Sequence, residues 1–489
     1  MGPRSPVTTG KVELEDVQGI VRSGYGTLPE AVFLILTIAD PASAKAWLAS
    51  APVTNAAFQK QIPSALHVAL TSGGLRRIGL SEEALASFPA EFKSGMSGDE
   101  SRTRRLGDLG PSAPQSWTWG GPENAPVDVV AMLYAEAGAL VDWRRLVETP
   151  SFFAGFHLVR ELRTGLMDGR EPFGFADGLS QPSIDWIRDT RSQENDEYHY
   201  RDRIAAGEMV LGYTNEYGLV TDRPFVPEQA DPHGVLRAFV GDDRRDLGAN
   251  GSYLVIRQLE QDVTGFWQFL ESVGGSRQAA EQLAEKMVGR ARSGTPLAAV
   301  ESKASTVHEP SNDFDFDGDP DGITCPLGAH IRRANPRNAD IPGGTQSRLS
   351  GLLRQLGLPR PLPRTDVIAS ARFHRILRRG RKYDPSQETG DMSGGLYFVC
   401  LNANIARQFE FIQNAWLESS KFGGLSSESD PIVGSRVPLL DGSRTDSFTC
   451  QTNGAPNRIE SLPSFVTVRG GAYFFLPGLR ALQYLAALP

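Results

Sequence analysis

The stretch AVFLILTI, residues 31–38, is a continuous apolar run rich in β-branched residues, and it predicts a buried strand. It is followed by PASAKAWL, residues 41–48, where proline in the first turn precedes residues that favour a helix. A strand that leads directly into a helix indicates a fold in which helices pack on a sheet. These two segments therefore begin an alternation that can be followed outward along the chain.

The first third of the chain continues this alternation. Strand-like stretches are expected at 64–70, 127–134 and 152–162, and helical stretches at 75–78, 81–88 and 135–147. Together with the first pair they give the order β-α-β-β-α-β, which is typical of a ferredoxin-like unit.

The second half repeats this theme without a close sequence repeat. Strands are expected at 252–259, 373–377, 394–401 and 471–476, and helices at 263–273, 278–288 and 405–416. We therefore predict an α+β fold with two tandem ferredoxin-like units, each an antiparallel four-stranded sheet with helices. The expected division is an N-terminal unit at 1–200, a polar connection at 201–245 and a C-terminal unit at 246–489.

Composition excludes several classes of protein. The 489 residues carry a formal net charge of −8 and show no long basic stripe, which argues against nucleic-acid binding. Three cysteines do not make a disulfide framework. No signal-like apolar segment follows the start, and the run at 31–38 is too short to cross a bilayer. We expect a cytoplasmic protein that does not bind membranes.

His330 is one of seven histidines, and a lone histidine is most often a structural residue. Its segment, CPLGAHIRRANPR at 325–337, contains several arginines. A single histidine ligand leaves the other face of a haem iron open, as peroxidases and globins require. The arginines that follow could neutralise haem propionates through charge-assisted hydrogen bonds.

Two further segments have candidate chemistry. FGFADGLSQP at 173–182 contains Asp177, and its ordinary interpretation is a turn. The functional interpretation is a carboxylate that moves a proton on a ligand. FHRILRRGRKY at 373–383 contains Arg378, either on a solvated basic face or placed to stabilise charge as an O–O bond breaks.

Together the three segments resemble the dye-decolorising peroxidase family. The distal Gly-x-x-Asp-Gly motif corresponds to Gly174–Gly178, the proximal segment to Cys325–Arg333 and the distal arginine segment to Ile376–Gly380. The resemblance covers almost the whole chain. It implies two ferredoxin-like units with haem b in the C-terminal one. It also implies a peroxidase that reduces hydrogen peroxide while it oxidises organic reductants such as dyes and phenolics.

On the proximal side, the resemblance implies that His330 is the axial iron ligand and that Arg337 contacts a haem propionate. Asp430, in SDPIVG at 429–434, resembles the family's acid that accepts the other ring N–H of the proximal histidine. Such an acid orients the imidazole and increases its basicity.

On the distal side, the resemblance implies that Asp177 and Arg378 act on hydrogen peroxide. Leu396 and Phe398 resemble apolar residues that line the distal side, although an ordinary strand core would explain them equally well. Asp384 stands where many relatives have glycine, and no role is assigned to it.

Other functions remain open at this point. A haem-binding or haem-delivery protein would need only His330, so the presence of Asp177 and Arg378 argues against it. An enzyme that decomposes chlorite would not need a distal acid that carries a proton. A peroxidase enclosed in a compartment would need a docking tag, for which the C-terminal residues show no flexible extension. A homo-oligomer is also left open.

Overall fold

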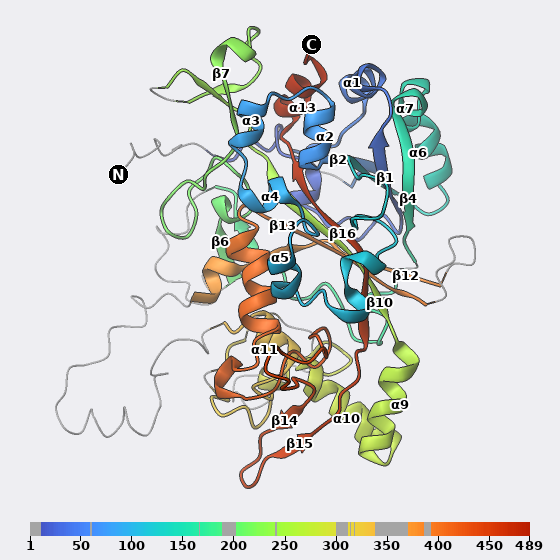
Figure 1. The fold of residues 1–489 in the computed structure, drawn as a ribbon, viewed down its shortest axis with the longest axis vertical. Coiled ribbons are helices and arrows are strands. Elements are labelled where there is room, and N and C mark those ends of the chain that lie inside the picture. The colour runs from blue at the N-terminus through green and yellow to red at the C-terminus, as the bar shows by residue number, and fades with distance from the viewer. Residues whose placement is uncertain are drawn as a thin grey trace, which may run out of the picture.

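The computed structural model describes residues 11–58, 61–165, 167–187, 202–239, 242–299, 312, 314–316, 318–337, 370–385 and 393–489. Its centre is one long antiparallel sheet made by two groups of strands (Figure 1). The N-terminal group is β1 (Glu30–Ile38), β2 (Ser64–Leu70), β3 (Val129–Ala135) and β4 (Phe156–Arg163). The C-terminal group is β10 (Ser252–Gln261), β11 (Leu377–Arg378), β12 (Arg381–Tyr383), β13 (Gly395–Asn402) and β16 (Val466–Leu476).

Both groups have the same strand order. The N-terminal strands lie in the order β2-β3-β1-β4, and the C-terminal strands in the order β11-β13-β10-β16, with β12 also paired to β13. In each group the first strand lies in the middle: β1 lies between β3 and β4, and β10 lies between β13 and β16. The predicted α+β fold with two ferredoxin-like units is confirmed.

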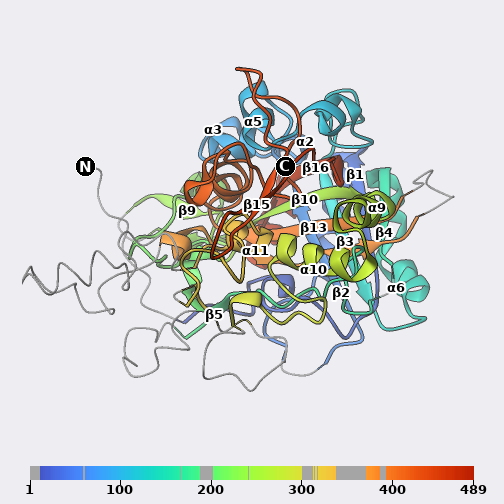
Figure 2. The same cartoon turned by 90° about the horizontal axis from the view of Figure 1, so that it is seen from below.

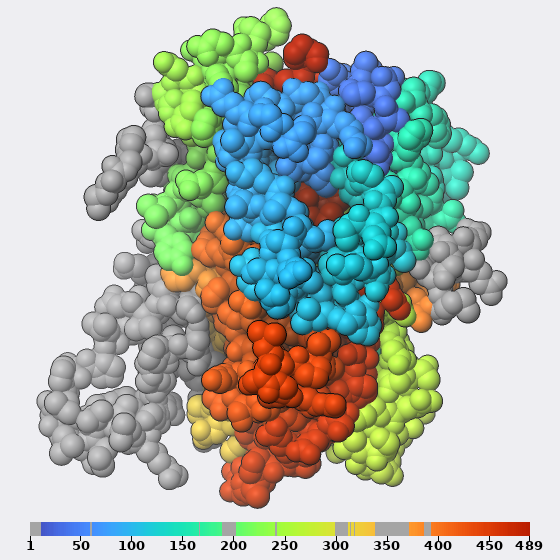
Figure 3. All heavy atoms as spheres, in the orientation of Figure 1, coloured from blue at the N-terminus to red at the C-terminus, as the bar shows by residue number. Residues whose placement is uncertain are grey.

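The two units share one sheet because their edges meet. β16 pairs with β2 through Phe475 and Leu70, so the hydrogen-bonded ladder continues from one unit into the other. Figure 3 shows the N-terminal residues, blue to cyan, and the C-terminal residues, orange to red, as adjoining parts of one surface.

Helices cover the sheet and one end of the molecule. Several begin at a residue whose side chain accepts a backbone N–H, such as Asp40, Ser81 and Ser276, which stabilises the first turn. Figure 2 views the molecule from the end that carries α9, α10 and α11. The helices are α1 (Pro41–Ser50), α2 (Ser72–Arg77), α3 (Glu82–Ala86), α4 (Ala90–Ser94), α5 (Glu100–Arg105), α6 (Leu140–Val147), α7 (Pro150–Gly155), α9 (Val263–Gly274), α10 (Arg277–Val288), α11 (His330–Ala334) and α13 (Leu479–Ala486).

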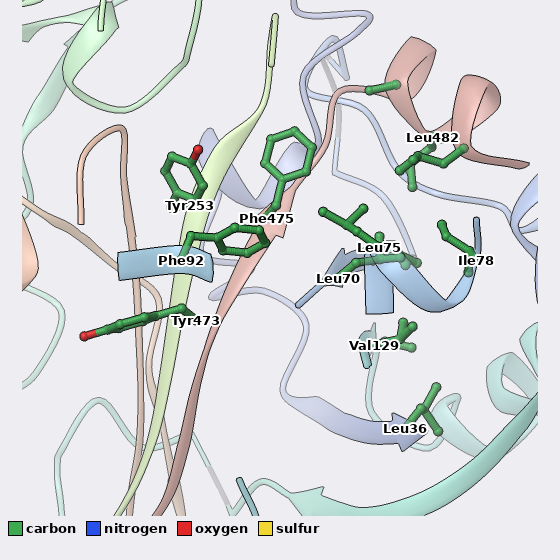
Figure 4. Close-up of a cluster of buried hydrophobic side chains, with 14 of the residues drawn as sticks. Leu36, Leu70, Leu75, Ile78, Phe92, Val129, Tyr253, Tyr473, Phe475 and Leu482 are labelled. Atoms are coloured by element: carbon green, nitrogen blue, oxygen red, sulfur yellow. The ribbon is translucent and has the colours of Figure 1, made fainter. Parts of the chain in front are cut away.

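Both faces of the sheet are buried, which explains the apolar run in β1. Leu34 and Leu36 point into one core, whereas Phe33 and Ile35 point into the other. Alternate residues of a strand face opposite sides, so a strand buried on both sides reads as continuously apolar. Figure 4 shows part of the first core, which includes Leu36, Leu70, Leu75, Ile78, Phe92, Val129, Tyr253, Tyr473, Phe475 and Leu482.

Shorter strands and turns lie between these elements. β5 (Ser183–Asp185) pairs with β6 (Arg203–Ala205), and β14 (Phe448–Cys450) pairs with β15 (Asn457–Ile459). β7 (Phe225–Pro227), β8 (Arg237–Ala238) and β9 (Arg244–Asp246) form a small sheet inside the segment predicted to be a polar connection. The division at residue 200 lies outside the described residues. The proposed domain boundaries stay predictions.

Some predicted elements were wrong in type or extent. Residues 373–377 do not form a strand, because Ser370–His374 is a 3-10 helix, labelled η8, and only Leu377–Arg378 is extended. The His374 ring stacks on Phe411 with centroids 3.7 Å apart, a tertiary contact that local sequence does not show.

Three further elements differ from the predictions, two in where they begin and one in the type of helix. The helix predicted at 135–147 begins only at Leu140, after Gly138 with a φ of 80°. The strand predicted at 152–162 begins at Phe156, because α7 occupies the preceding residues. The helix predicted at 405–416 consists of two π-helical segments, η9 (Ala406–Glu410) and η10 (Ile412–Leu417). Among the described residues, no helix has the length and apolar character needed to span a membrane.

Candidate active site

A cavity of about 310 Å³ brings together most of the residues that the sequence singled out. Asp177, His330, Arg378, Leu396 and Phe398 all line it, although they come from segments far apart in the chain. Much of the remaining lining comes from β10, η10, β16, the loop after α5 and residues 432–437, and apolar side chains predominate. A mostly apolar pocket with a few convergent charged groups is the usual form of a ligand site.

His330 is held by Asp430. It is the first residue of α11, and its Nδ1 lies 2.9 Å from Oδ2 of the fully buried Asp430 carboxylate. The other carboxylate oxygen accepts the backbone N–H groups of Ile432 and Val433, each at 2.9 Å. The carboxylate is thereby fixed, and the imidazole keeps only Nε2 for a ligand.

The charges of this pair support each other. Burial lowers the pKa of His330, but the adjacent Asp430 carboxylate outweighs it, so the pKa lies above its ordinary value. Burial raises the pKa of Asp430, yet the His330 partner and the backbone N–H of Val433 bring it below its ordinary value. Asp430 is therefore an anion whose negative charge faces the Nδ1 side of the ring.

Arg332 and Arg333, which the sequence suggested as propionate partners, do not line the cavity. The guanidinium of Arg333 is buried and donates to the carbonyl oxygens of Trp416 and Glu428, 2.9 Å from each. Arg332 bonds to Asp319 and to the carbonyl oxygen of Cys325. Both arginines tie α11 to neighbouring loops, so they fix the position of His330.

Asp177 and Arg378 approach each other in the cavity. Nη1 of Arg378 lies 3.8 Å from Oδ1 of Asp177, and each side chain is 34% exposed. The backbone N–H of Gly178 donates to the same carboxylate oxygen at 2.6 Å. Gly174 and Gly178 have φ values of 97° and 80°, in the left-handed region that favours glycine. The Gly-x-x-Asp-Gly motif is therefore a turn, as its ordinary interpretation held, and it also presents Asp177 to the cavity.

Four arginines that the sequence analysis did not single out also line the cavity: Arg257, Arg290, Arg375 and Arg436. Arg290 donates to Oγ of Ser180 at 2.9 Å, and Arg375 lies 3.0 Å from a carboxylate oxygen of Asp202. Burial, together with the nearby charge of Arg378, lowers the pKa of Arg290 to about 10. The sequence could have indicated Arg375 as a cavity residue, because it lies three residues before Arg378. Arg290 follows α10 and has no neighbouring motif that would have indicated it.

Leu396 and Phe398 lie on β13 and face the cavity. The alternate residues of the strand, Tyr397 and Val399, face the opposite core. This is ordinary strand alternation, so the two interpretations of these residues are compatible. Arg337 does not line the cavity. Its guanidinium donates to the carbonyl oxygen of Phe314 and to Oδ1 of Asn312, and its role as a propionate partner stays a prediction.

The donor set fits a largely apolar group that carries one metal ion and acidic substituents. His330 offers one nitrogen, and the cavity-lining arginines offer positive charge to carboxylates. Among the described residues, no cluster of three or more His, Cys, Asp or Glu side chains could hold a metal ion by itself. This pattern agrees with haem, whose iron needs one or two axial protein ligands.

Sequence relatives cover most of the chain. A multifunctional dye peroxidase from an Amycolatopsis species is 30% identical over 451 residues, which are 86% of this chain and 82% of that protein. A dye-decolorizing peroxidase from Mycetinis scorodonius is 28% identical over 505 residues, 98% of this chain and 88% of that one. No family model matches the chain.

Solved structures resemble the whole fold. A fungal DyP-type peroxidase from Auricularia auricula-judae superposes with a TM-score of 0.72 at 24% identity, covering 98% of this chain and 100% of that one. A dye-decolorizing peroxidase in complex with 2,6-dimethoxyphenol gives a TM-score of 0.71 at 21% identity, covering 97% and 100%.

Proposed function

The chain belongs to the dye-decolorising peroxidase family, and from this premise we propose that its cavity holds haem b and reduces hydrogen peroxide. The electrons come from organic reductants such as dyes and phenolics, the class to which the 2,6-dimethoxyphenol bound by a relative belongs. Haem supplies the redox chemistry when bound, whereas the protein supplies orientation and electrostatics.

The residues that would hold haem follow from the cavity. Nε2 of His330 would bind the iron, because Asp430 occupies the other ring nitrogen. Arg290 and Arg375 are the arginines that we propose for the propionates, because both line the cavity and the charge of Arg378 acts on both. Phe398 packs against Phe409 with ring centroids 6.1 Å apart, which gives the cavity an apolar wall.

Asp177 and Arg378 divide the work on peroxide. The carboxylate of Asp177 accepts the proton of one peroxide oxygen and delivers it to the other, which then leaves as water. The guanidinium of Arg378 stabilises the negative charge that develops on the leaving oxygen. Their separation of 3.8 Å within one cavity is the observation that carries this proposal. A haem-delivery protein would have no use for this pair, so peroxidase chemistry is preferred.

The test compares Asp177→Asn and Arg378→Leu with Asp168→Asn. Asp168 is a half-exposed aspartate of the same loop that bonds to Lys382 and does not line the cavity. Stopped-flow spectroscopy of the haem-loaded protein measures how fast peroxide shifts the Soret band. Loss of an acid–base group should slow this step by about 10²–10⁴-fold, whereas Asp168→Asn should leave it unchanged. Unchanged rates in both cavity variants would contradict the assignment.

His330→Ala tests the ligand separately. The purified variant should contain little haem, because removal of the axial ligand leaves only peripheral contacts. Normal haem content would contradict the role of His330. We further propose a cytoplasmic protein whose partners are hydrogen peroxide and a small organic reductant, without nucleic acid or membrane.

A further inference from the structure

A buried pair of Tyr25 and His67 lies outside the cavity, in the core on the other face of the sheet. The hydroxyl of Tyr25 lies 3.0 Å from Nε2 of His67, which is on β2. The two rings are nearly parallel, with centroids 5.3 Å apart and planes inclined by 20°. The exposed fractions are 3% for Tyr25 and 0% for His67, so bulk water cannot exchange protons with either side chain.

The backbone is shaped to place this phenol. Tyr25 has a φ of 54°, a left-handed conformation that is uncommon for a residue other than glycine. A Cβ on Gly19 would come 2.3 Å from the Tyr25 hydroxyl, so only glycine leaves room for it. Sparsely populated backbone conformations cost free energy, and an observed one is a reason to consider a function.

The protonation of the pair suits proton transfer. Burial lowers the pKa of His67 to about 3, so the ring is neutral at any working pH. Burial also raises the pKa of Tyr25, which keeps the phenol protonated. A neutral imidazole has one acceptor nitrogen, and Nε2 can fill this role opposite the Tyr25 hydroxyl. Among the described residues Nδ1 of His67 has no hydrogen-bond partner in either tautomer, so no other contact takes the acceptor role away from Nε2.

A series of aromatic rings connects the pair with the cavity wall. Tyr397 lies on β13 between two residues that line the cavity. Its ring centroid is 6.1 Å from that of Phe33, which is 5.8 Å from Tyr134, which in turn is 5.0 Å from Tyr25. Each ring is therefore in contact range of the next. The whole series lies in the second core, and it reaches the strand that forms the cavity wall at Tyr397, between the cavity-lining Leu396 and Phe398.

Arg379 connects the same two places through hydrogen bonds. Its Nη1 donates to the carbonyl oxygen of Arg378 at 3.2 Å, and its Nε donates to the carbonyl oxygen of Ile20 at 2.8 Å. Burial, with the opposing influence of Tyr134 and Tyr25, brings the pKa of Arg379 to about 10. The charge of this buried cation acts on both phenols, where it partly offsets the effect of burial on the pKa of Tyr25 and of Tyr134.

We propose that Tyr25 is a redox-active residue that gives one electron to the active site when peroxide arrives without a reductant, while His67 takes the phenolic proton. This inference rests on the proposed peroxidase function. Tyr25 would protect the active site, because the oxidising equivalent moves from the site to a side chain that can lose and regain a proton.

The step balances in electrons and protons. Hydrogen peroxide takes two electrons from the active site, and solvent supplies the two protons that complete its reduction to water, so the site is left with two oxidising equivalents. Tyr25 supplies one electron through the ring series, and its O–H proton moves to Nε2 of His67, which leaves a neutral phenoxyl ring beside an imidazolium. The second oxidising equivalent stays at the active site for a reductant. When a reductant later returns the electron, the proton moves back from His67 to the phenoxyl oxygen.

The experiment uses the full haem-loaded chain, mixed with hydrogen peroxide in the absence of reductant and frozen for electron paramagnetic resonance. The wild-type protein should give a tyrosyl signal whose hyperfine structure collapses when ring-deuterated tyrosine is incorporated. Tyr25→Phe should lose the signal and inactivate after fewer peroxide additions. His67→Gln keeps a hydrogen-bond acceptor but removes the base, and it should also lose the signal.

Tyr253→Phe is the matched control, because Tyr253 is equally buried but its hydroxyl has no hydrogen-bond partner among the described residues. It should keep the wild-type signal. A wild-type Soret response without a tyrosyl signal, or a full signal in Tyr25→Phe or in His67→Gln, would overturn the inference and leave the peroxidase function standing. A wild-type protein without any Soret response would overturn both.

Discussion

Replacing Asp430 with asparagine should weaken haem binding by roughly one to two orders of magnitude. In the wild-type protein Oδ2 lies 2.9 Å from Nδ1 of His330, and Oδ1 accepts two backbone N–H groups. In the variant, the asparagine oxygen would keep the backbone contacts and its NH₂ group would face the Nδ1–H of His330. Two donors would then face each other, so the hydrogen bond to His330 would be lost. A hydrogen bond to a charged group contributes about 1.5–3 kcal/mol. At about 1.4 kcal/mol per factor of ten, its loss corresponds to about 10–100-fold.

Haem transfer to an excess of apomyoglobin measures this loss as a faster dissociation and a larger dissociation constant. The reduction potential of the bound haem should rise, because a neutral partner leaves the imidazole a weaker electron donor. Asp319→Asn is the control. Asp319 is also buried, accepts the backbone N–H groups of Thr324 and Cys325, and bonds to Arg332, but does not contact His330.

The result that would refute this reasoning is specific. If Asp430→Asn bound haem with wild-type affinity and potential, the carboxylate would not tune the ligand. If Asp319→Asn changed affinity and potential equally, the effect of Asp430 would come from general destabilisation of the proximal loops rather than from its contact with His330.

Two further predictions concern stability. Gly19→Ala should destabilise the fold by about 1–3 kcal/mol in urea unfolding, because the added Cβ would overlap the Tyr25 hydroxyl, whereas Gly26→Ala, with no atom within 4 Å, should not. Equal midpoints for the two variants would contradict this packing. Burial raises the pKa of Glu418 from 4.5 to about 7, so between these values the folded state binds a proton that the unfolded state lacks, and stability should fall by up to about 3 kcal/mol as pH rises. Glu418→Gln should flatten this dependence, and an unchanged slope would count against it.

Local sequence was enough for much of the fold. The run at 31–38 predicted β1, and the residues around it predicted α1 and β2, because strand and helix periodicities are local properties. The motifs around Asp177, His330 and Arg378 identified the family, since each is a short contiguous segment. Prediction failed at 373–377, where the ring of His374 stacks on Phe411 from a distant segment.

Only the tertiary structure decided how these residues combine. It brought Asp177 within 3.8 Å of Arg378, 201 positions further along the chain, and His330 within 2.9 Å of Asp430, 100 positions further along. It also placed Arg290 in the cavity wall and kept Arg337 out of it. Sequence determines which groups are available, because residue type and local periodicity are written in it. Which of them meet depends on how two ferredoxin-like units pack, since long-range contacts arise only when the sheet and its covering segments have assembled.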